Sequence, residues 1–218
     1  MKYYMAFDAG ATRTRALFAD KTGTILYGAE SGPCNPSEYG MDFAISALVT
    51  LGQGILARFP DAAGKPLVAL AGVSGLVRQD QAKTLAEALC EGLPCAEARA
   101  TTDLHPVLFA NAGHDPGILM VAGTGAAVLA KEAFGVPVRL GGRGHVMGDE
   151  GSAYHVAVEA LRALARAEDA REDPGMLAEA LLNAAGVQTV NELAAWSASA
   201  AKHQIAALAK PVLDCAQQ

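Results

Sequence analysis

The sequence predicts an α/β fold in two parts, and three observations support this prediction. Strand and helix patterns alternate over the first half of the chain, and a set of three strands then appears a second time. The last part is rich in alanine, with 20 of the 46 alanines in the final 68 residues, and lacks Val/Ile-rich runs, which indicates helices. A hydrophobic content of 51% is sufficient for a buried core.

The first part, residues 1–115, contains a predicted meander of three strands followed by alternating helices and strands. Glycine-containing turns separate the strands, and prolines end the meander. A long amphipathic helix that begins after its cap, Ser37, and has its apolar residues from Met41 to Phe59 is expected to cover the sheet. The predicted strands are 3–8, 12–20, 24–30, 67–73 and 98–102, and the other predicted helices are 81–89 and 104–111.

The second part, residues 116–218, repeats the three strands and ends in helices. Glycine again stands in the first turn between strands, so the same glycine-containing turn occurs in both parts. Pro174 is expected in the first turn of a helix, where its missing N–H costs nothing. The predicted strands are 118–122, 126–131 and 137–140, and the predicted helices are 152–168, 174–185, 190–199 and 204–216.

Charge and composition exclude several classes of protein. A net charge of −6 and the lack of basic runs argue against a nucleic-acid-binding surface. The uncharged stretch 116–130 is interrupted by three glycines and is shorter than the roughly 20 apolar residues of a membrane helix. The N-terminal segment is typical of a strand rather than a signal peptide, so we expect a cytoplasmic protein. The four cysteines lack zinc-ligand spacing and are expected to be free thiols.

Two glycine-containing turns, Asp8–Thr12 and Gly123–Gly125, open the two sets of strands. Glycine lets backbone N–H groups point at an anion, and a threonine hydroxyl adds a donor. Neither turn is a Walker loop or a dinucleotide-binding motif, since strands rather than helices follow. Each turn is therefore either an ordinary hairpin turn or a phosphate-binding loop.

Three charged residues at strand ends have two interpretations each. Asp8 ends an otherwise apolar strand, where its carboxylate could hold Mg2+ through water beside a nucleotide's phosphates or hydrogen-bond its own turn. Arg13 could neutralise phosphate or pair with a surface acid. Asp103 follows a strand and precedes a helix, so it is either the N-cap of that helix or a rigidly held general base.

The segment Gly141–Ser152 is the most informative in the chain. Five of its twelve residues are glycine, which indicates a loop whose backbone closely approaches another group. Asp149 and Glu150 precede the next helix, and such carboxylates could bind sugar hydroxyls. A capped start of the helix would explain Asp149 and Ser152, but not so many glycines. His145 by itself is more typical of a structural histidine.

Four segments together resemble the BadF/BadG/BcrA/BcrD ATPase family, and within it the N-acetylglucosamine kinases of the actin-like ATPase and sugar kinase superfamily. The segments are DAGATR (8–13), TTD (101–103), VAGTG (121–125) and GGRGHVMGDEGSAY (141–154), and the resemblance extends over residues 1–218. It implies a ribonuclease H-like (actin-like ATPase) fold of two lobes, with ATP and sugar in the cleft between them. It also implies transfer of the ATP γ-phosphate to the 6-hydroxyl of N-acetylglucosamine or glucosamine.

The resemblance also implies roles for individual residues. Asp103 would be the base that acts on the sugar hydroxyl, and Asp8 would help to position Mg2+. The residues expected at the ATP phosphates are Asp8, Gly10, Thr12, Arg13, Gly123, Thr124 and Gly125. The residues expected around the sugar are Asn35, Ser74, Gly75, Arg143, Gly144, His145 and Asp149.

Departures from the family pattern leave the substrate open. Arg143 stands where the animal N-acetylglucosamine kinases have Trp, and Ala126 and Ala127 replace a Ser-Asn pair, which removes two polar sugar contacts. The family also contains activator ATPases that hold an iron–sulfur cluster, but no Cys lies between Cys95 and Cys215, so we expect no cluster. A non-catalytic sugar sensor with the same fold is a further alternative.

The length of the chain is another departure. Residues 152–218 contain no candidates for two further parallel strands or for a glycine pair that would hold adenosine. We therefore expect an incomplete second lobe, a truncated product or fragment, and weak binding of ATP. The expected partners are ATP and an amino sugar, and a homodimer is compatible with the sequence.

Overall fold

The computed structural model describes residues 2–76, 78–170, 173 and 175–217. The chain consists of two compact units, Met1–Gly113 and His114–Gln218. None of the described helices combines the length and the apolar character that crossing a bilayer requires.

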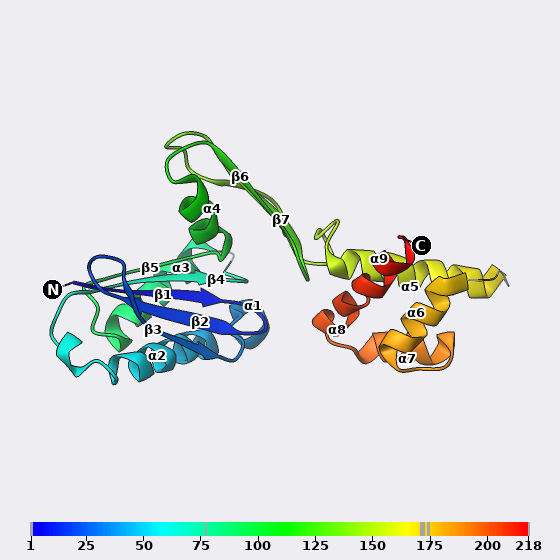
Figure 1. The fold of residues 1–218 in the computed structure, drawn as a ribbon, viewed down its shortest axis with the longest axis horizontal. Coiled ribbons are helices and arrows are strands. Elements are labelled where there is room, and N and C mark those ends of the chain that lie inside the picture. The colour runs from blue at the N-terminus through cyan, green and yellow to red at the C-terminus, as the bar shows by residue number, and fades with distance from the viewer. Residues whose placement is uncertain (1, 77, 171–172, 174, 218) are drawn as a thin grey trace. The chain divides into compact units, whose positions relative to one another are not determined.

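The first unit is built around a five-stranded sheet, among its described residues, with the strand order β3-β2-β1-β4-β5 (Figure 1). β1, β2 and β3 form an antiparallel meander, and β4 and β5 run parallel to β1. The strands are β1 (Tyr3–Ala9), β2 (Thr14–Ala19), β3 (Ile25–Ser31), β4 (Leu67–Val73) and β5 (Glu97–Thr101). The predicted strands of this unit are thus confirmed, with small differences at their ends.

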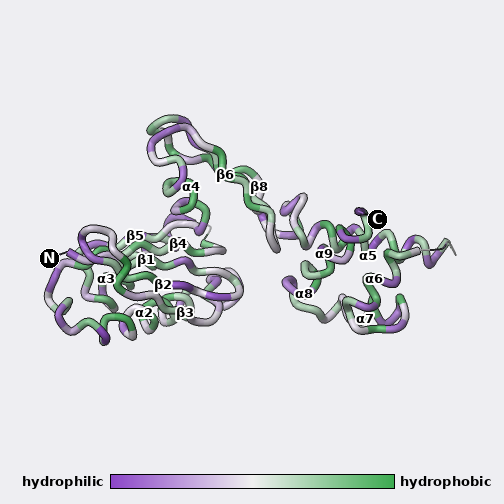
Figure 2. The backbone as a smooth tube through the Cα atoms, viewed as in Figure 1, coloured by the Kyte–Doolittle hydropathy of each residue, from purple (hydrophilic) through white to green (hydrophobic). Residues whose placement is uncertain are grey.

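Hydrophobic residues of β6 in the second unit stand out in green in Figure 2, and they belong to a three-stranded antiparallel sheet. Its strands, among the described residues of the unit, are β6 (Gly117–Ala122), β7 (Ala126–Lys131) and β8 (Val138–Gly141), as predicted to within one residue. Register places apolar side chains in rows on one face, and these are Ile118, Ala130 and Val138, followed by Met120, Val128 and Leu140. Several of them are largely exposed within the chain.

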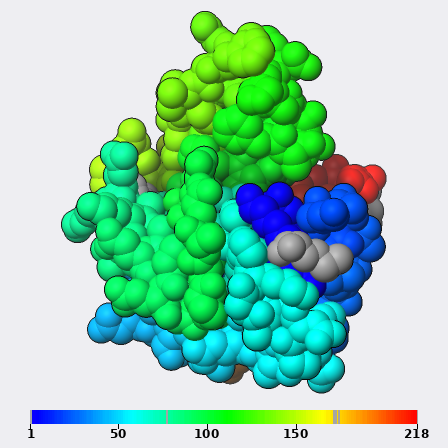
Figure 3. Space-filling view, turned by 90° about the vertical axis from the view of Figure 1, so that its left-hand side faces the viewer, coloured from blue at the N-terminus to red at the C-terminus, as the bar shows by residue number. Residues whose placement is uncertain are grey.

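The core of the first unit lies on one face of the five-stranded sheet. Alternation along β1 buries Met5, Phe7 and Ala9 on this face and leaves the residues between them exposed. Two helices, α2 (Met41–Leu56) and α3 (Gln79–Gly92), pack against these side chains and against each other. Figure 3 faces this unit, with α2 in blue to cyan and α3 in teal to green.

The predicted helix cap at Ser37 is wrong. Asn35 caps the short helix α1 (Pro36–Tyr39) instead, because its side-chain oxygen accepts a hydrogen bond from the Ser37 backbone N–H at 2.9 Å. Gly40 then adopts a φ of 86°, a left-handed conformation that ends α1, and α2 begins at Met41. The single long helix predicted from the apolar spacing is therefore two helices.

The same helix ends earlier than predicted, at Leu56. Pro60 opens a short 3-10 helix, η1 (Pro60–Ala62), and Phe59 before it has an extended φ of −125°. Proline disfavours the helical conformation in the preceding residue. Phe59 still packs against the core, although it lies outside α2.

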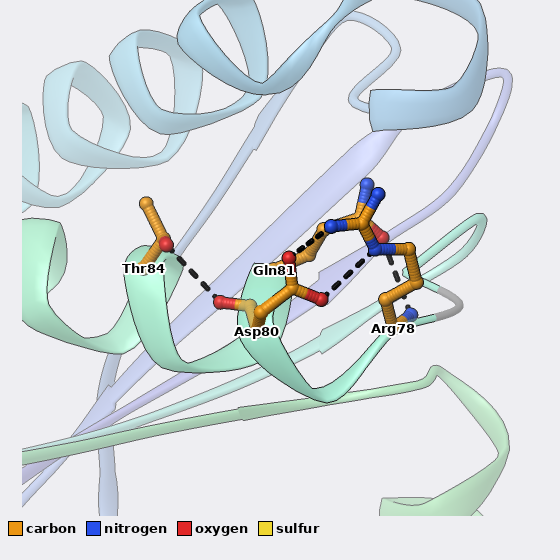
Figure 4. Close-up of polar contacts among 4 residues, drawn as sticks. All are labelled: Arg78, Asp80, Gln81 and Thr84. Atoms are coloured by element: carbon orange, nitrogen blue, oxygen red, sulfur yellow. Dashed lines mark hydrogen bonds and ion pairs between the residues drawn. The ribbon is translucent and has the colours of Figure 1, made fainter.

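Polar contacts fix the first turn of α3 (Figure 4). The Gln81 side-chain oxygen accepts a hydrogen bond from the Arg78 backbone N–H at 3.2 Å, and Arg78 Nε donates to Asp80 Oδ1 at 2.9 Å. The Thr84 hydroxyl donates to the Asp80 carbonyl at 3.0 Å. The hydrogen bond from the Arg78 guanidinium lowers the pKa of the Asp80 carboxyl. With these partners the helix begins at Gln79, before the predicted start at residue 81.

The tail of the second unit is helical, as predicted. The helices are α5 (Ala153–Ala170), α6 (Gly175–Ala185), α7 (Val190–Ser199), α8 (Lys202–Ala207) and α9 (Ala209–Cys215). Leu164, Leu181 and Leu193 are buried between them. The single helix predicted over 204–216 is wrong, because Pro211 cannot donate to the carbonyl four residues earlier and the chain divides into α8 and α9. Pro174 lies outside the described residues.

Candidate functional site

The carboxyl ends of the parallel strands place Asp8, Gly72 and Thr101 in one row. Gly72 of β4 is the register partner of Asp8 in β1 and also of Thr101 in β5. Register partners point to the same face of a sheet, which here is the face opposite the core because the neighbours of Asp8 in β1 are buried. Asp8 is exposed there. The row therefore presents a carboxylate beside a position without a side chain.

Asp103 lies against this row. A Cβ atom added at Gly72 would lie 3.4 Å from the Asp103 Cα and 3.0 Å from Cγ of Pro106 in α4 (Leu104–Ala112). Asp103 occupies the N-cap position of α4, but its side chain makes no capping hydrogen bond. Asp103 thus holds the predicted N-cap position without the side-chain hydrogen bond of a cap. The fold brings Asp103 to the face that carries Asp8, with the Asp103 backbone packed over Gly72.

Thr102 and His105 stabilise the start of α4. The Thr102 carbonyl accepts a hydrogen bond from the His105 backbone N–H at 3.2 Å, and the Thr102 hydroxyl lies 2.8 Å from His105 Nδ1. Asp103 lies between these two residues, at the start of α4.

Backbone hydrogen bonds attach the first glycine turn to two neighbouring loops. The Gly10 N–H donates to the Arg13 carbonyl at 2.9 Å and closes the turn. The Gly10 carbonyl accepts from the Cys34 N–H at 2.9 Å, and the Ala9 carbonyl accepts from the Ser74 N–H at 2.8 Å. Thr12 and Arg13 are exposed at the tip of the turn. The turn therefore adjoins both the loop before α1 and the loop after β4.

These two loops carry Asn35, Ser74 and Gly75, which the sequence assigned to the sugar. Asn35 is buried, and a Cβ atom at Gly75 would overlap its side-chain oxygen. Gly75 has a φ of +80°, and its carbonyl accepts a hydrogen bond from the Ser37 hydroxyl at 2.8 Å. The Asn35 amide also donates to Glu38 Oε1 at 3.3 Å. The fold thus brings this set together beside the first turn.

Cys34 is the buried residue next to the first turn. Burial raises the pKa of its thiol to about 11, and the thiol lies 3.6 Å from the Ala44 carbonyl. The side chain is therefore uncharged at neutral pH and adds no negative charge beside the turn.

The second glycine turn is fixed to the beginning of α5. The Gly123 N–H donates to the Gly125 carbonyl at 2.9 Å, which closes the turn. The Gly123 carbonyl accepts a hydrogen bond from the Ala153 N–H, the first of α5, at 2.9 Å. Gly123 and Thr124 are exposed. Because helix N-termini favour anions, a phosphate at this turn would lie in a favourable field.

Most glycines of the segment 141–152 adopt backbone conformations that other residues disfavour. Gly141, Gly142, Gly144 and Gly151 all have a positive φ, which side chains disfavour. Gly142 also lies so close to β7 that an added Cβ atom would be 2.6 Å from Ala127 Cβ. The predicted close approach of the loop backbone to another group is confirmed at Gly142. The group that it approaches is strand β7 of the same unit.

Asp149 lies between the second turn and α8. Asp149 as a whole is only 5% exposed, and Lys202 Nζ lies 2.8 Å from its Oδ2. The same oxygen would be 3.0 Å from a Cβ atom added at Gly125. The cap of α5 is Ser152, whose hydroxyl accepts a hydrogen bond from the His155 N–H at 3.1 Å. Lys202 could not be recognised from the sequence, since no local pattern links residues 53 positions apart.

His145 and Lys202 both contact the ring of Tyr154. The His145 and Tyr154 rings meet edge to face with centroids 4.9 Å apart, and Lys202 Nζ lies 5.7 Å from the Tyr154 ring centroid. Arg143, Gly144 and His145 are exposed. The predicted residues of this loop therefore lie beside a lysine that the sequence did not single out.

The carboxylates can be tested for their fit to Mg2+. Across the described ranges no group of three or more His, Cys, Asp or Glu is placed to hold a metal ion. Asp8 is a single exposed carboxylate at a strand end. This fits an Mg2+ ion that keeps most of its water and is bound chiefly through substrate phosphates.

Comparisons with known proteins extend over almost the whole chain. A model of the BadF/BadG/BcrA/BcrD ATPase family matches residues 7–218. The chain is 23% identical over 218 residues to an N-acetylmuramic acid/N-acetylglucosamine kinase of Clostridium acetobutylicum, which covers 97% of this chain and 70% of that protein.

Two solved structures are similar along the full length of this chain. A candidate N-acetylglucosamine kinase of Chromobacterium violaceum has a TM-score of 0.81 and 28% identity, over 100% of this chain and 75% of that one. A second, from Porphyromonas gingivalis, has a TM-score of 0.74 and 21% identity, over 98% and 72%. The predicted α/β fold of the ribonuclease H-like, actin-like ATPase type is confirmed.

Proposed function

Since the chain belongs to the BadF/BadG/BcrA/BcrD ATPase family, we propose that it is a hexosamine kinase that transfers the γ-phosphate of ATP to the 6-hydroxyl of N-acetylglucosamine or glucosamine. Relatives named as N-acetylglucosamine kinases support this substrate class. The observation that carries the proposal is the common placement of Asp8 and Asp103 on one face, where Asp103 packs over Gly72, the register partner of Asp8.

Asp103 is the general base of the proposed reaction. It accepts the proton of the 6-hydroxyl while that oxygen bonds to the γ-phosphorus, and ADP leaves with the electrons of the broken P–O bond. The packing of Pro106 against Gly72 holds the strand end and the helix start in one place.

The first turn and Asp8 bind the phosphates in this proposal. Backbone N–H groups near Gly10, the Thr12 hydroxyl and the Arg13 guanidinium are the donors. Asp8 would hold Mg2+ through water, and the ion, when bound, would supply positive charge that neutralises the phosphates. Beside this turn, Asn35, Ser74 and Gly75 form the first group of proposed sugar contacts.

The second unit contributes a further phosphate turn and further sugar contacts. Gly123, Thr124 and Gly125 stand at the N-terminus of α5, which supports their proposed contact with phosphate. The exposed Arg143, Gly144 and His145 are proposed to contact the sugar. Asp149 keeps Oδ2 on Lys202 and would offer its other carboxylate oxygen to a sugar hydroxyl.

A panel of sugars tests the proposed activity. The chain is incubated with ATP, Mg2+ and one of N-acetylglucosamine, glucosamine, N-acetylmuramic acid or glucose, and ADP release is followed by a coupled assay. We expect ADP release with one of the first two sugars. Calorimetric binding of a hexosamine without any ADP release would instead identify a non-catalytic sugar sensor and contradict the proposal.

Asp103→Asn separates chemistry from binding. Loss of the base should lower kcat by roughly a hundredfold or more, while hexosamine affinity stays within a few-fold. Asp61→Asn is the matched control, because Asp61 is exposed in η1, away from the strand ends. Equal activity of Asp103→Asn and Asp61→Asn would refute the role of Asp103.

A further inference from the structure

Cys90 and Cys95 are brought together by the corner between α3 and β5. Their sulfur atoms lie 3.4 Å apart, with the Cys95 thiol donating toward the Cys90 sulfur. The Cys95 sulfur also lies 3.5 Å from the Leu89 carbonyl. Both residues are partly exposed, so small reagents can reach them. Both are free thiols, as the sequence predicted.

Packing against α2 holds the corner between the two thiols. Leu93 is fully buried, and a Cβ atom added at Gly52 of α2 would be 2.6 Å from its side chain. A Cβ atom at Gly92 would likewise be 2.6 Å from Val49. The Gln53 side chain donates a hydrogen bond to the Gly92 carbonyl at 3.0 Å. The chain between the cysteines therefore has little freedom to separate them.

The chain beyond Cys95 is also attached. The Ala96 N–H donates to the carbonyl of Leu67 in β4 at 2.8 Å, directly before β5 begins. Cys90 lies in the last part of α3, so both sulfurs are carried by fixed elements. A disulfide requires sulfur atoms about 2.0 Å apart, so the two sulfurs must approach each other further from the present 3.4 Å.

We propose that Cys90 and Cys95 form a redox-active dithiol, which closes to an intramolecular disulfide by exchange with a small-molecule disulfide such as oxidised glutathione. The Cys90 thiolate attacks one sulfur of the reagent, and one glutathione thiolate leaves. Cys95 then loses its proton to solvent and attacks the Cys90 sulfur, and the second glutathione leaves. Two protein thiols are oxidised and one external disulfide is reduced to two thiols.

The order of the two attacks follows from the surroundings of Cys95. Burial raises the pKa of this thiol to about 12, so it stays protonated at neutral pH. It is also the donor in the contact between the two sulfurs. Cys90 is therefore the attacking thiol, and Cys95 is the resolving thiol.

One tryptic peptide reports the bond. Residues 84–99 contain both cysteines and are bounded by Lys83 and Arg99, with no Lys or Arg between. The folded chain is treated with oxidised glutathione, quenched with acid, alkylated in denaturant and digested. We expect peptide 84–99 without alkyl groups or glutathione and lighter than the dithiol form by two hydrogen atoms. Cleavage after Glu91 should leave two fragments that separate only on reduction.

Serine variants test the assignment of the two roles. Cys95→Ser should retain glutathione on Cys90, at a level about tenfold above the wild-type chain, because the resolving thiol is missing. Cys90→Ser should take up little glutathione at Cys95. Cys215→Ser, in the other unit, is the control and should form the bond as the wild type does.

Two results would overturn the proposal. One is a wild-type peptide 84–99 that keeps two alkylated thiols in the folded chain under conditions that oxidise the urea-unfolded chain. The other is a stable glutathione adduct in the wild type at the level seen in Cys95→Ser. Circular dichroism of each variant establishes that the comparison is made between folded chains. If a variant does not fold, its oxidation is compared with that of the unfolded wild-type chain.

Discussion

Lys202 Nζ lies 2.8 Å from Asp149 Oδ2 and neutralises a carboxylate that is almost fully buried beside the second glycine turn. Asp149 has a left-handed φ of 64°, and its carboxylate stands against Gly125. A lysine from the helical tail is therefore part of the local structure of the turn. The tail supports the proposed phosphate and sugar contacts of its own unit as well as that unit's core.

Removing the lysine should destabilise the chain. Lys202→Met leaves the Asp149 carboxylate buried without its partner, and we expect a loss of about 3 kcal/mol in the free energy of unfolding by urea. Lys210→Met is the matched control, because Lys210 pairs with Asp214 on an exposed helix face. That change should cost less than about 0.5 kcal/mol. Equal losses in the two variants would contradict a structural role for the buried pair.

The approach of Gly75 to Asn35 can be tested with alanine. Gly75→Ala introduces strain at a φ of +80° and a Cβ atom that overlaps the Asn35 oxygen. We expect a loss of about 3 kcal/mol in unfolding free energy and, if the proposed function holds, weaker binding of hexosamine. Gly64→Ala has a similar φ of +71° but open space, so its expected loss is about 1 kcal/mol. The difference between the variants measures the overlap, and no difference would refute it.

Two glycines of α2 should respond in opposite directions to the same substitution. Gly52→Ala places a Cβ atom 2.6 Å from the Leu93 side chain and 3.2 Å from the Met5 sulfur, which should destabilise the chain by about 2 kcal/mol. Gly54→Ala meets open space and should stabilise the helix by about 0.5 kcal/mol. Thermal unfolding of both variants measures these effects. A stabilised Gly52→Ala would show that Leu93 does not occupy this position.

Cys34 should make stability depend on alkaline pH. The pKa of its thiol is 9.0 in the unfolded chain and about 11 in the folded chain, because burial disfavours the thiolate. Below pH 9 the thiol is protonated in both the folded and the unfolded chain, and its full contribution to stability is present. As the pH rises from 9 to 11 only the unfolded chain releases it, so about 2 to 3 kcal/mol of stability is lost through this group.

Cys34→Ala removes this dependence. Its free energy of unfolding, measured by urea at several values of pH, should fall less steeply between pH 9 and 11 than that of the wild-type chain. Its stability at pH 7 changes separately, because a buried sulfur is lost. Parallel curves for the two proteins would show that the Cys34 thiolate is tolerated in the fold.

Much of the secondary structure could be predicted because it depends on neighbouring residues. Alternating apolar residues in β1 and glycine in both turns indicated the strands, and the alanine-rich tail indicated helices. Errors arose where one residue overrides a pattern. Gly40 ends a helix that the apolar spacing continues, and Pro211 divides another. Gly40 acts through its backbone conformation and Pro211 through its missing N–H. The spacing of apolar residues reveals neither effect.

The candidate site was predictable as a set of residues, but not as an arrangement. The glycine turns, Asp8, Asp103 and the segment 141–152 are recognisable because unusual residue types are concentrated there. Their roles toward ATP and sugar remain predictions. The sequence left Asp103 open between a helix cap and a base, and the absence of a capping hydrogen bond came from the structure.

The α/β class, the repeated strands and the family can be recognised from the amino acids alone, since these follow from local propensity and from motifs of adjacent residues. Three relationships appear only in the folded chain: Asp103 packs over Gly72, Lys202 neutralises Asp149, and the Cys90 and Cys95 sulfurs meet. These relationships depend on strand register and on the packing of helices that are distant in sequence. Register and packing minimise the free energy of the whole unit. No short segment of the sequence carries the information that sets them.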